Sequence, residues 1–403
     1  MSGNFPRSGS LLRGRGLSRS NAAFTLVELL VSMTILILLM MVLVSMVNQT
    51  GSMWHHANAK IEEFREARDG FEAMNRRLSQ ATLNAYWDYN DPNNPKSYIR
   101  QSELRFISGP SLLDSVTPVV PRPTHSIFFF APLGFVIPTS TTDTTAANYQ
   151  GLDNLLNMWG YFVEYNDDTA TRPAFVTSAP RKRFRLMELM QPSQSLQLYN
   201  LETQGGGNLK YLKPDWFQSC VSTGATPPRP VHVLAENIIA LILLPKLTPT
   251  DQKKWSYTDA SLVPAGGTTP GYYYSSTGYD VTGSSKLKTT SDVHLNPTNQ
   301  LPPIVQVTMV AIDEGSANRM TDTDVQSLKA EISGLFSDPA NLLGDLTGSP
   351  TPASGGLSLQ DYLSANAGNN QSGNHSSLKP INFRVFTSDV SIRAAKWSSN
   401  QKN

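Results

Sequence analysis

The sequence predicts an α+β protein, in which a long N-terminal helix packs on an antiparallel β-rich head with long loop insertions. Three observations predict this class. An apolar run follows a basic N-terminus, and apolar residues then recur every three or four positions. The rest of the chain alternates short segments rich in β-branched and aromatic residues with turn residues.

Residues 1–23 form a basic leader that contains arginines and no acidic residue. The apolar run extends from Phe24 to Val47 and is interrupted by Glu28 and a few hydroxyl residues. At about 1.5 Å per residue this run is about 36 Å long as a helix, enough to cross a bilayer core of about 30 Å. We therefore expect membrane contact through residues 24–47. The basic leader should stay cytoplasmic, which places the head outside the cytoplasm.

The small residues that could mark a cleavage site lie before the apolar run and not after it. A secretory signal is cut after its apolar region. Here Ala22 and Ala23 precede Phe24, whereas the run ends in a Ser-Met-Val-Asn sequence. Cleavage after Ala23 would remove the leader and leave the apolar helix on the mature protein.

Past Val47 the helix continues as an amphipathic segment over residues 48–85 and should end near 84–94, where turn residues gather. Its apolar positions are Ala57, Ile61, Phe64, Ala67, Phe71, Met74, Leu78 and Ala81. The intervening charged residues should face water or polar partners.

Residues 86–403 are predicted to form the β-rich exported head. Candidate strands lie at about 98–108, 125–131, 158–165, 183–190, 231–244, 304–312 and 381–394, the last as a hairpin-like pair around Thr387–Asp389. The polar stretches 201–230, 263–300 and 344–377 are predicted to be surface loops. The single cysteine, Cys220, excludes an internal disulfide, and we expect it to be an inert thiol in a loop.

Catalytic and metal-binding patterns do not emerge from the sequence, so we expect no enzyme activity, no cofactor and no metal site. The acidic clusters Asp88/Asn90/Asp91 and Asp322/Asp324 fit turns and helix caps better than a calcium site, because neither follows an EF-hand spacing. The basic run Arg181-Lys182-Arg183 with Arg185 fits a solvated strand edge. The chain has 33 Lys+Arg and 32 Asp+Glu, so its net charge is close to zero and it produces no strong positive electrostatic field. We therefore expect no nucleic-acid partner.

The segment Ala23-Phe24-Thr25-Leu26-Val27-Glu28 resembles the processing motif of type IV pilins and type II secretion pseudopilins. The resemblance implies that a prepilin peptidase cuts before Phe24 and methylates its new amine. It also implies an assembly role for Glu28, the fifth mature residue, whose carboxylate would meet the amine of a neighbouring subunit. The sequence departs from the family at Ala23, where a glycine is usual.

A second resemblance lies in the head. Ala235-Glu236-Asn237-Ile238-Ile239 and Leu301-Pro302-Pro303-Ile304-Val305-Gln306-Val307 look like the strand-opening patterns of J-type minor pseudopilins. The layout of the whole chain also resembles the Verru_Chthon cassette protein C family of pilin-like proteins. These resemblances imply partners among other pilin or pseudopilin subunits and the inner-membrane assembly machinery.

The leading hypothesis is a structural minor pilin or pseudopilin, anchored in the inner membrane and then assembled into a surface or periplasmic filament. One alternative is a tip adhesin or DNA-uptake pilin, with the contact made by the basic run and by Tyr272-Tyr273-Tyr274. Another is a membrane-anchored enzyme that uses the helix only as an anchor.

Overall fold

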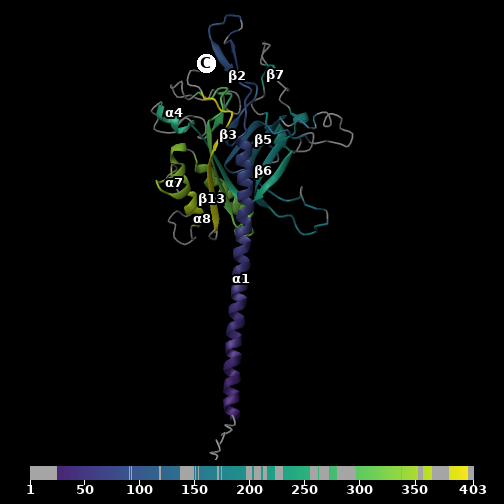
Figure 1. Ribbon diagram of the computed structural model, residues 1–403, viewed down its shortest axis with the longest axis vertical. Coiled ribbons are helices and arrows are strands. Elements are labelled where there is room, and N and C mark those ends of the chain that lie inside the picture. Colours follow the sequence, from purple (N-terminus) through teal and green to yellow (C-terminus); the bar gives the residue numbers. More distant parts are fainter. Residues whose placement is uncertain are drawn as a thin grey trace, which may run out of the picture. The chain divides into compact units, whose positions relative to one another are not determined.

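The computed structural model describes a large part of the chain (Figure 1). The described residues are 25–89, 91, 93–117, 119–136, 149, 151–152, 154–169, 172–173, 175–196, 202–203, 210–211, 216–222, 230–254, 262, 272–278, 296–336, 338–352, 357–364 and 381–397, and the side chains of 55–63, 202–203 and 210–211 are left aside. The chain divides into two compact units, Met1–Ala59 and Lys60–Asn403, which are treated separately below.

The first element is the helix α1, which spans Leu26–Leu78 and contains 53 residues. It ends earlier than the sequence analysis predicts. Tight turns follow, in which the amides of Gln80 and Ala81 donate to carbonyls three residues back. The amide of Thr82 then donates to the carbonyl of Phe130 at 2.8 Å, so the chain leaves the helix to join a strand.

The predicted amphipathic pattern is confirmed in the part of α1 that follows the side chains left aside. Ala67, Phe71, Met74 and Leu78 are buried, whereas the charged residues between them are largely exposed. Gly70 lies on the buried side, where an added Cβ would lie 3.1 Å from the Cβ of Ala235. A small residue at this position lets the helix approach the strand closely.

The larger sheet is antiparallel and six-stranded, with the order β11-β3-β4-β5-β6-β9. Its strands are β11 (Tyr274–Ser275), β3 (Ile107–Pro110), β4 (His125–Pro132), β5 (Leu156–Asn166), β6 (Arg183–Gln191) and β9 (Val231–Glu236). Three of these correspond to the strands predicted at 125–131, 158–165 and 183–190. The strand predicted at 98–108 is wrong, because it is two strands: β2 (Tyr98–Gln101), which pairs with β1 (Tyr86–Tyr89), and β3.

The smaller sheet is antiparallel and three-stranded, with the order β10-β12-β13. Its strands are β10 (Ile238–Lys246), β12 (Ile304–Ile312) and β13 (Phe383–Ser391). The predicted hairpin around Thr387–Asp389 is wrong. The β12–β13 register continues without a break from Ile312↔Phe383 to Ile304↔Ser391, so the polar residues lie in the middle of one strand.

Asn237 joins the two sheets and divides the strand predicted at 231–244 into β9 and β10. Its φ of 60 lies in the left-handed region, which asparagine tolerates better than most residues. Its amide donates to the carbonyl of Phe184 on β6 at 2.8 Å, and its carbonyl accepts from the amide of Ile312 on β12 at 2.9 Å. One residue therefore bonds both sheets.

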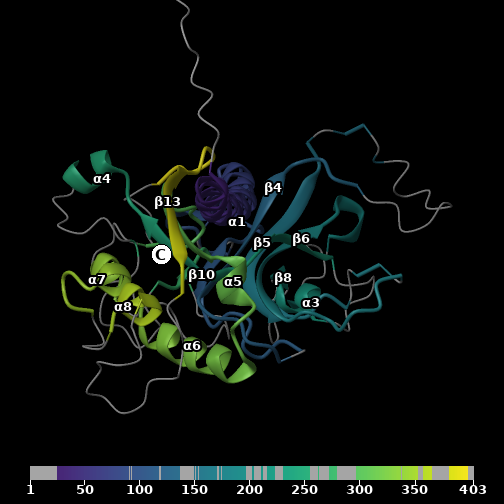
Figure 2. The ribbon, with the colours of Figure 1, turned by 90° about the horizontal axis from the view of Figure 1, so that it is seen from below.

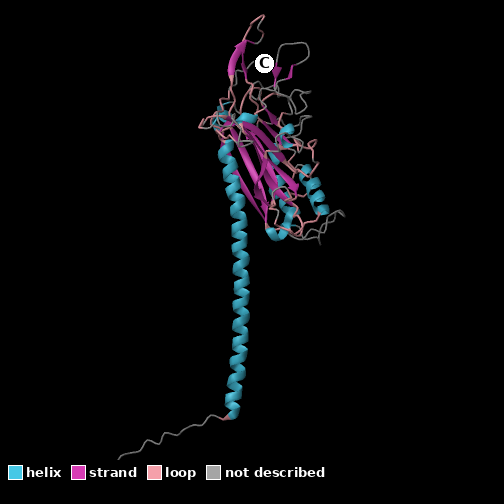
Figure 3. Ribbon diagram, turned by 90° about the vertical axis from the view of Figure 1, so that its right-hand side faces the viewer, coloured by secondary structure: helices cyan, strands magenta, loops and turns pink. Residues whose placement is uncertain are grey.

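The larger sheet is covered on both faces. On one face the last turns of α1 pack against aromatic residues of β4 and β5 and against the smaller sheet, and on the other face Trp216, Phe217 and Val221 pack against Phe128 and Phe130. Figure 3 shows the strands of the head alongside the last turns of α1. In Figure 2, β13 lies between these turns of α1 and the helices α6, α7 and α8.

Short elements complete the described fold, and several fall within stretches predicted to be surface loops. These elements are η1 (Ser193–Ser195), β7 (Glu202–Thr203), β8 (Lys210–Tyr211), α3 (Gln218–Val221), α4 (Pro249–Lys254), α5 (Glu314–Ala317), α6 (Asp322–Gly334), η4 (Pro339–Asn341), α7 (Leu342–Thr347) and α8 (Leu359–Ser364). The loop prediction is wrong for α3, Tyr272–Tyr274 and α8, which supply buried apolar side chains. The rest of the predicted loops includes residues outside the described ranges.

Candidate assembly site

The helix α1 begins with a reciprocal contact between Thr25 and Glu28. The amide and hydroxyl of Thr25 donate to Glu28 Oε2 at 3.0 and 2.9 Å, and the amide of Glu28 donates to Thr25 Oγ1 at 3.3 Å. This is a capping box, which satisfies amides that have no partner within the helix. The contact turns the carboxylate of Glu28 back toward the start of the helix.

Ala23 and Phe24, the predicted cleavage and methylation residues, lie outside the described residues. Thr25, one residue further on, was not singled out by the sequence analysis. Its signal was present, since a threonine three positions before a glutamate at the start of an apolar run is a sequence signature of a capping box. Thr25 therefore joins Glu28 as a residue that shapes this end of the helix.

The part of α1 from Leu26 to Trp54 contains 29 residues and is long and apolar enough to cross a membrane, since an 18-residue window within it has a mean hydropathy of 2.8. Its large apolar side chains are exposed, as Leu30 and Leu38 illustrate at 57% and 61%. The hydroxyls of Ser32 and Thr34 donate to backbone carbonyls three residues back, so each hydroxyl has a hydrogen-bond partner within the helix. Such a surface is stable in lipid or against other apolar helices, not in water.

Further along α1, Arg77 joins the helix to the larger sheet. Its guanidinium forms an ion pair with Glu188 on β6, and it lies 4.6 Å from the centroid of the Trp159 ring. The hydroxyl of Tyr161 donates to the same carboxylate at 3.1 Å. Burial raises the pKa of Glu188, and the charge of Arg77 opposes that rise. The contact fixes the position of this part of the helix on the sheet.

The prediction of a solvated strand edge is wrong for Arg183 and Arg185, which are buried on β6, whereas Arg181 and Lys182 precede the strand and are exposed. The strand β6 pairs with β5 on one side and β9 on the other. The side chains of Arg183 and Arg185 are 4% and 2% exposed. Arg183 forms a two-point ion pair with Glu314, and Arg185 Nε donates to Glu236 Oε1 at 3.1 Å. Both buried arginines are thus paired with partly exposed carboxylates of the head.

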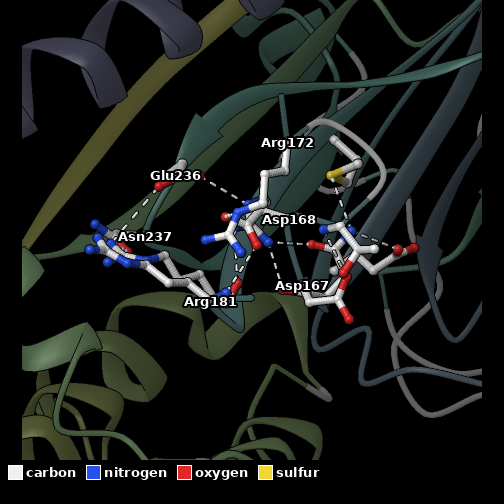
Figure 4. A network of polar contacts seen from close by, with 12 residues as sticks. Asp167, Asp168, Arg172, Arg181, Glu236 and Asn237 are labelled. Carbon is white, nitrogen blue, oxygen red and sulfur yellow. Dashed lines mark hydrogen bonds and ion pairs between the residues drawn. The ribbon is translucent and has the colours of Figure 1, made fainter. Parts of the chain in front are cut away.

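The other two residues of the run are also engaged. Figure 4 shows the network around Arg181, whose amide donates to Asp168 Oδ1 at 2.9 Å, while Arg172 forms an ion pair with Asp168. Lys182 Nζ contacts Asp322 Oδ2 at 2.7 Å in an exposed ion pair. Arg181 thus contributes its backbone to contacts within the head, and Lys182 contributes its side chain.

The tyrosine run, which the adhesin alternative uses as a contact, packs inside the head. Tyr272, Tyr273 and Tyr274 are all buried. The hydroxyl of Tyr274 donates to the carbonyl of Gln300 at 2.9 Å, and the ring of Tyr272 lies 4.8 Å from that of His125. These rings are not available as an adhesive loop.

The prediction of caps and turns is confirmed for Asp91 and for the cluster Asp322/Asp324, whereas Asp88 lies in the strand β1 and Asn90 lies outside the described residues. Thr321 and Asp324 form the capping box of α6, and Asp322 contacts Lys182. Asp91 Oδ1 accepts from the amide of Asn93 at 2.9 Å. Within the described ranges no group of three or more His, Cys, Asp or Glu side chains is placed to hold a metal ion.

Cys220 lies in α3 and not in a loop. Its side chain is buried, and burial raises the pKa of its thiol. A raised thiol pKa lowers the fraction of reactive thiolate, which agrees with the expected inert role.

Comparison with known proteins gives one match. The model of the prokaryotic N-terminal methylation motif matches residues 18–44, a range that includes Ala23, Phe24 and Glu28. No curated protein and no solved structure matches the chain. Together with the apolar helix and the antiparallel head, the motif supports a type IV pilin-like subunit that is processed by a prepilin peptidase.

Proposed function

We propose that this protein is a non-catalytic structural subunit of a type IV pilus-like filament or a type II secretion pseudopilus. In this proposal a prepilin peptidase cuts before Phe24, and the mature chain assembles with other pilin or pseudopilin subunits. The observation that supports it best is the position of the methylation motif, residues 18–44, across the start of the exposed apolar helix.

The chemistry of Glu28 supports the assembly step. No other Asp, Glu, Lys or Arg occurs between Phe24 and Trp54. An unpaired carboxylate in a membrane costs about 3 kcal/mol at the centre of the bilayer and less near its surface. An amine created by cleavage before Phe24 would supply a matching positive charge on a neighbouring subunit. The capping box already directs the carboxylate toward the helix start, where that amine would approach.

We further propose that the subunit is held in the inner membrane before assembly, with the head outside the cytoplasm. The arginines at positions 7, 13, 15 and 19 support this orientation, because basic residues beside a membrane helix favour the cytoplasmic side. The head supports a minor role, since a bulky head packs awkwardly along a filament built mainly of one subunit. The resemblance to J-type pseudopilins and to Verru_Chthon cassette protein C agrees with a minor subunit.

The two alternatives differ from this proposal in what they require. An adhesin or DNA-uptake pilin that binds through the basic run and the tyrosine run would need Arg183, Arg185 and the tyrosines, whose side chains the head uses internally. A membrane-anchored enzyme would need neither cleavage before Phe24 nor Glu28.

The test is a Glu28→Ala variant, expressed with the prepilin peptidase and the assembly machinery. Cleavage should continue, and incorporation into sheared filaments should fall at least tenfold. The matched control is Glu72→Ala, which removes an exposed carboxylate from the same helix beyond the apolar segment. Normal incorporation of the Glu28 variant would refute the pairing argument.

A further inference from the structure

The hairpin of β1 and β2 has an exposed aromatic face. The register pairs Trp87 with Arg100 and Tyr89 with Tyr98, and directly opposite residues of an antiparallel pair share a face. Trp87, Tyr89 and Tyr98 are 57%, 45% and 62% exposed. The rings of Tyr89 and Tyr98 stack with centroids 4.9 Å apart, and Arg100 lies 5.4 Å from the centroid of the Trp87 ring. The chain thus displays in water the side chains that usually dominate binding interfaces.

The hairpin is held to the head at its base. Asn84 Oδ1 accepts from the amides of Glu103 and Leu104, each at 3.0 Å. Arg100 Nη1 donates to Gln300 Oε1 at 3.0 Å and to the carbonyl of Lys396 at 2.9 Å. Figure 1 shows β2 projecting beyond the larger sheet of the head. A platform fixed in this way loses little conformational freedom when it binds.

The size of the face argues against a protein partner. Each strand has four residues, about 14 Å at 3.4 Å per residue, and two strands lie about 5 Å apart. Two strand widths of about 5 Å each and a length of about 14 Å give the face a footprint of about 140 Å². A stable protein–protein interface needs about 800 Å² from each partner. Such a narrow strip suits a slender chain better than a second protein.

The charge of the hairpin argues against a nucleic acid. From Tyr86 to Glu103 the chain has the acidic residues Asp88, Asp91 and Glu103 and the basic residues Lys96 and Arg100. The Arg100 guanidinium is engaged with the head. Binding of single-stranded nucleic acid combines aromatic stacking with a positively charged groove that follows the phosphates. The aromatic face of the hairpin offers rings for stacking but lacks a positively charged groove, so it does not suit a nucleic acid.

We propose that this aromatic face, formed by Trp87, Tyr89 and Tyr98, binds a neutral polysaccharide. The C–H groups on the face of a sugar ring bear partial positive charge and stack on the negative face of an aromatic ring. The hydroxyls of Tyr89 and Tyr98 can exchange hydrogen bonds with sugar hydroxyls. Trp87 and Tyr89 lie two positions apart, about 7 Å along the strand, so the face spans more than one sugar ring.

The test is co-sedimentation of the purified full-length protein with insoluble cellulose, chitin and β-1,3-glucan. A detergent without a sugar headgroup must be used, because such a headgroup would compete. Poly-dT and heparin resins serve as the polyanion probes. The wild-type protein should sediment with at least one neutral polysaccharide, and the double variant Trp87→Ala/Tyr98→Ala should bind at least tenfold more weakly. The assay needs no filament, so its result is independent of the proposed assembly.

The matched control is Phe175→Ala, which removes an aromatic side chain that is 83% exposed elsewhere on the head and should leave binding unchanged. Tyr98→Phe keeps the ring and should retain most of the binding. If thermal unfolding shows the double variant to be destabilised, Trp87→Leu, which keeps an apolar side chain on the strand, replaces it. Equal binding by wild type and double variant, retention on poly-dT instead of the polysaccharides, or no retention on any neutral polysaccharide would overturn the proposal.

Discussion

The guanidinium of Arg183 on β6 and the carboxylate of Glu314 on α5 form a two-point ion pair beside the residue that joins the two sheets. The side-chain amide of that residue, Asn237, donates to Glu314 Oε2 at 3.0 Å. Since α5 follows β12 directly, the pair ties the larger sheet to the smaller one. Charges that look like a surface patch in the sequence hold the head together.

Replacement of Glu314 by glutamine should therefore destabilise the head. The carboxylate of Glu236, at 3.9 Å, would be a more distant partner for the buried charge of Arg183, which would also keep its hydrogen bond to Asn318 Oδ1 at 3.0 Å. Loss of one partner of a fully buried pair costs about 3–5 kcal/mol, and since Glu314 is one-third exposed we expect about 1–3 kcal/mol. Urea unfolding of the full chain in detergent, followed by tryptophan fluorescence, measures this difference.

The control for that variant is Glu72→Gln. It breaks an ion pair with Arg68 whose two side chains are 68% and 61% exposed. Exposed pairs contribute about 0–1 kcal/mol, so the free energy of unfolding should hardly change. Equal effects of the two variants would contradict the role assigned to Glu314.

The contribution of Glu314 should depend on pH. Hydrogen bonds from Arg183, opposed by burial and aided by Asn237, lower the pKa of Glu314 from 4.5 to about 2. An acid whose pKa is lowered in the folded state stabilises the fold above its unfolded pKa, and this stabilisation is lost as pH falls through the folded pKa. The difference in unfolding free energy between wild type and Glu314→Gln should shrink between pH 4.5 and about 2. A difference that stays constant over this range would argue against the ion pair.

Gly160→Ala should destabilise the larger sheet. An added Cβ would lie 2.3 Å from Cδ1 of Phe128, whose ring is stacked on Phe217 with centroids 4.3 Å apart and has little room to move. Overpacking of this kind costs about 1–3 kcal/mol. The same urea titration measures it.

Gly334→Ala is the matched control for that substitution, because nothing lies within 4 Å of the added Cβ at the end of α6. In a helix, alanine is favoured over glycine by about 0.5–1 kcal/mol, so this variant should be neutral or slightly more stable. A loss of stability at position 334 as large as at position 160 would contradict the packing argument.

The sequence analysis correctly predicted the helix and the strands that are defined by patterns among neighbouring residues. The apolar run, the three-and-four spacing from Phe64 to Leu78 and the turn-bounded strands β4, β5 and β6 all depend on neighbouring residues, and all were found. Glu28 was predicted from a motif, and the structure adds its contact with Thr25.

The errors concern contacts between residues far apart in the sequence. The helix ends early because Thr82 bonds to Phe130, and the polar residues Thr387–Asp389 continue a strand because β12 pairs with them throughout. Arg183 looked exposed because its partner, Glu314, lies 131 residues away. A pattern of neighbouring residues cannot reveal a pairing of this kind.

The most direct test is mass spectrometry of the N-terminus of the protein expressed together with a prepilin peptidase. The account predicts a mature chain that begins at Phe24 with a methylated amine. A protein that is incorporated into filaments while it retains residues 1–23 would contradict it.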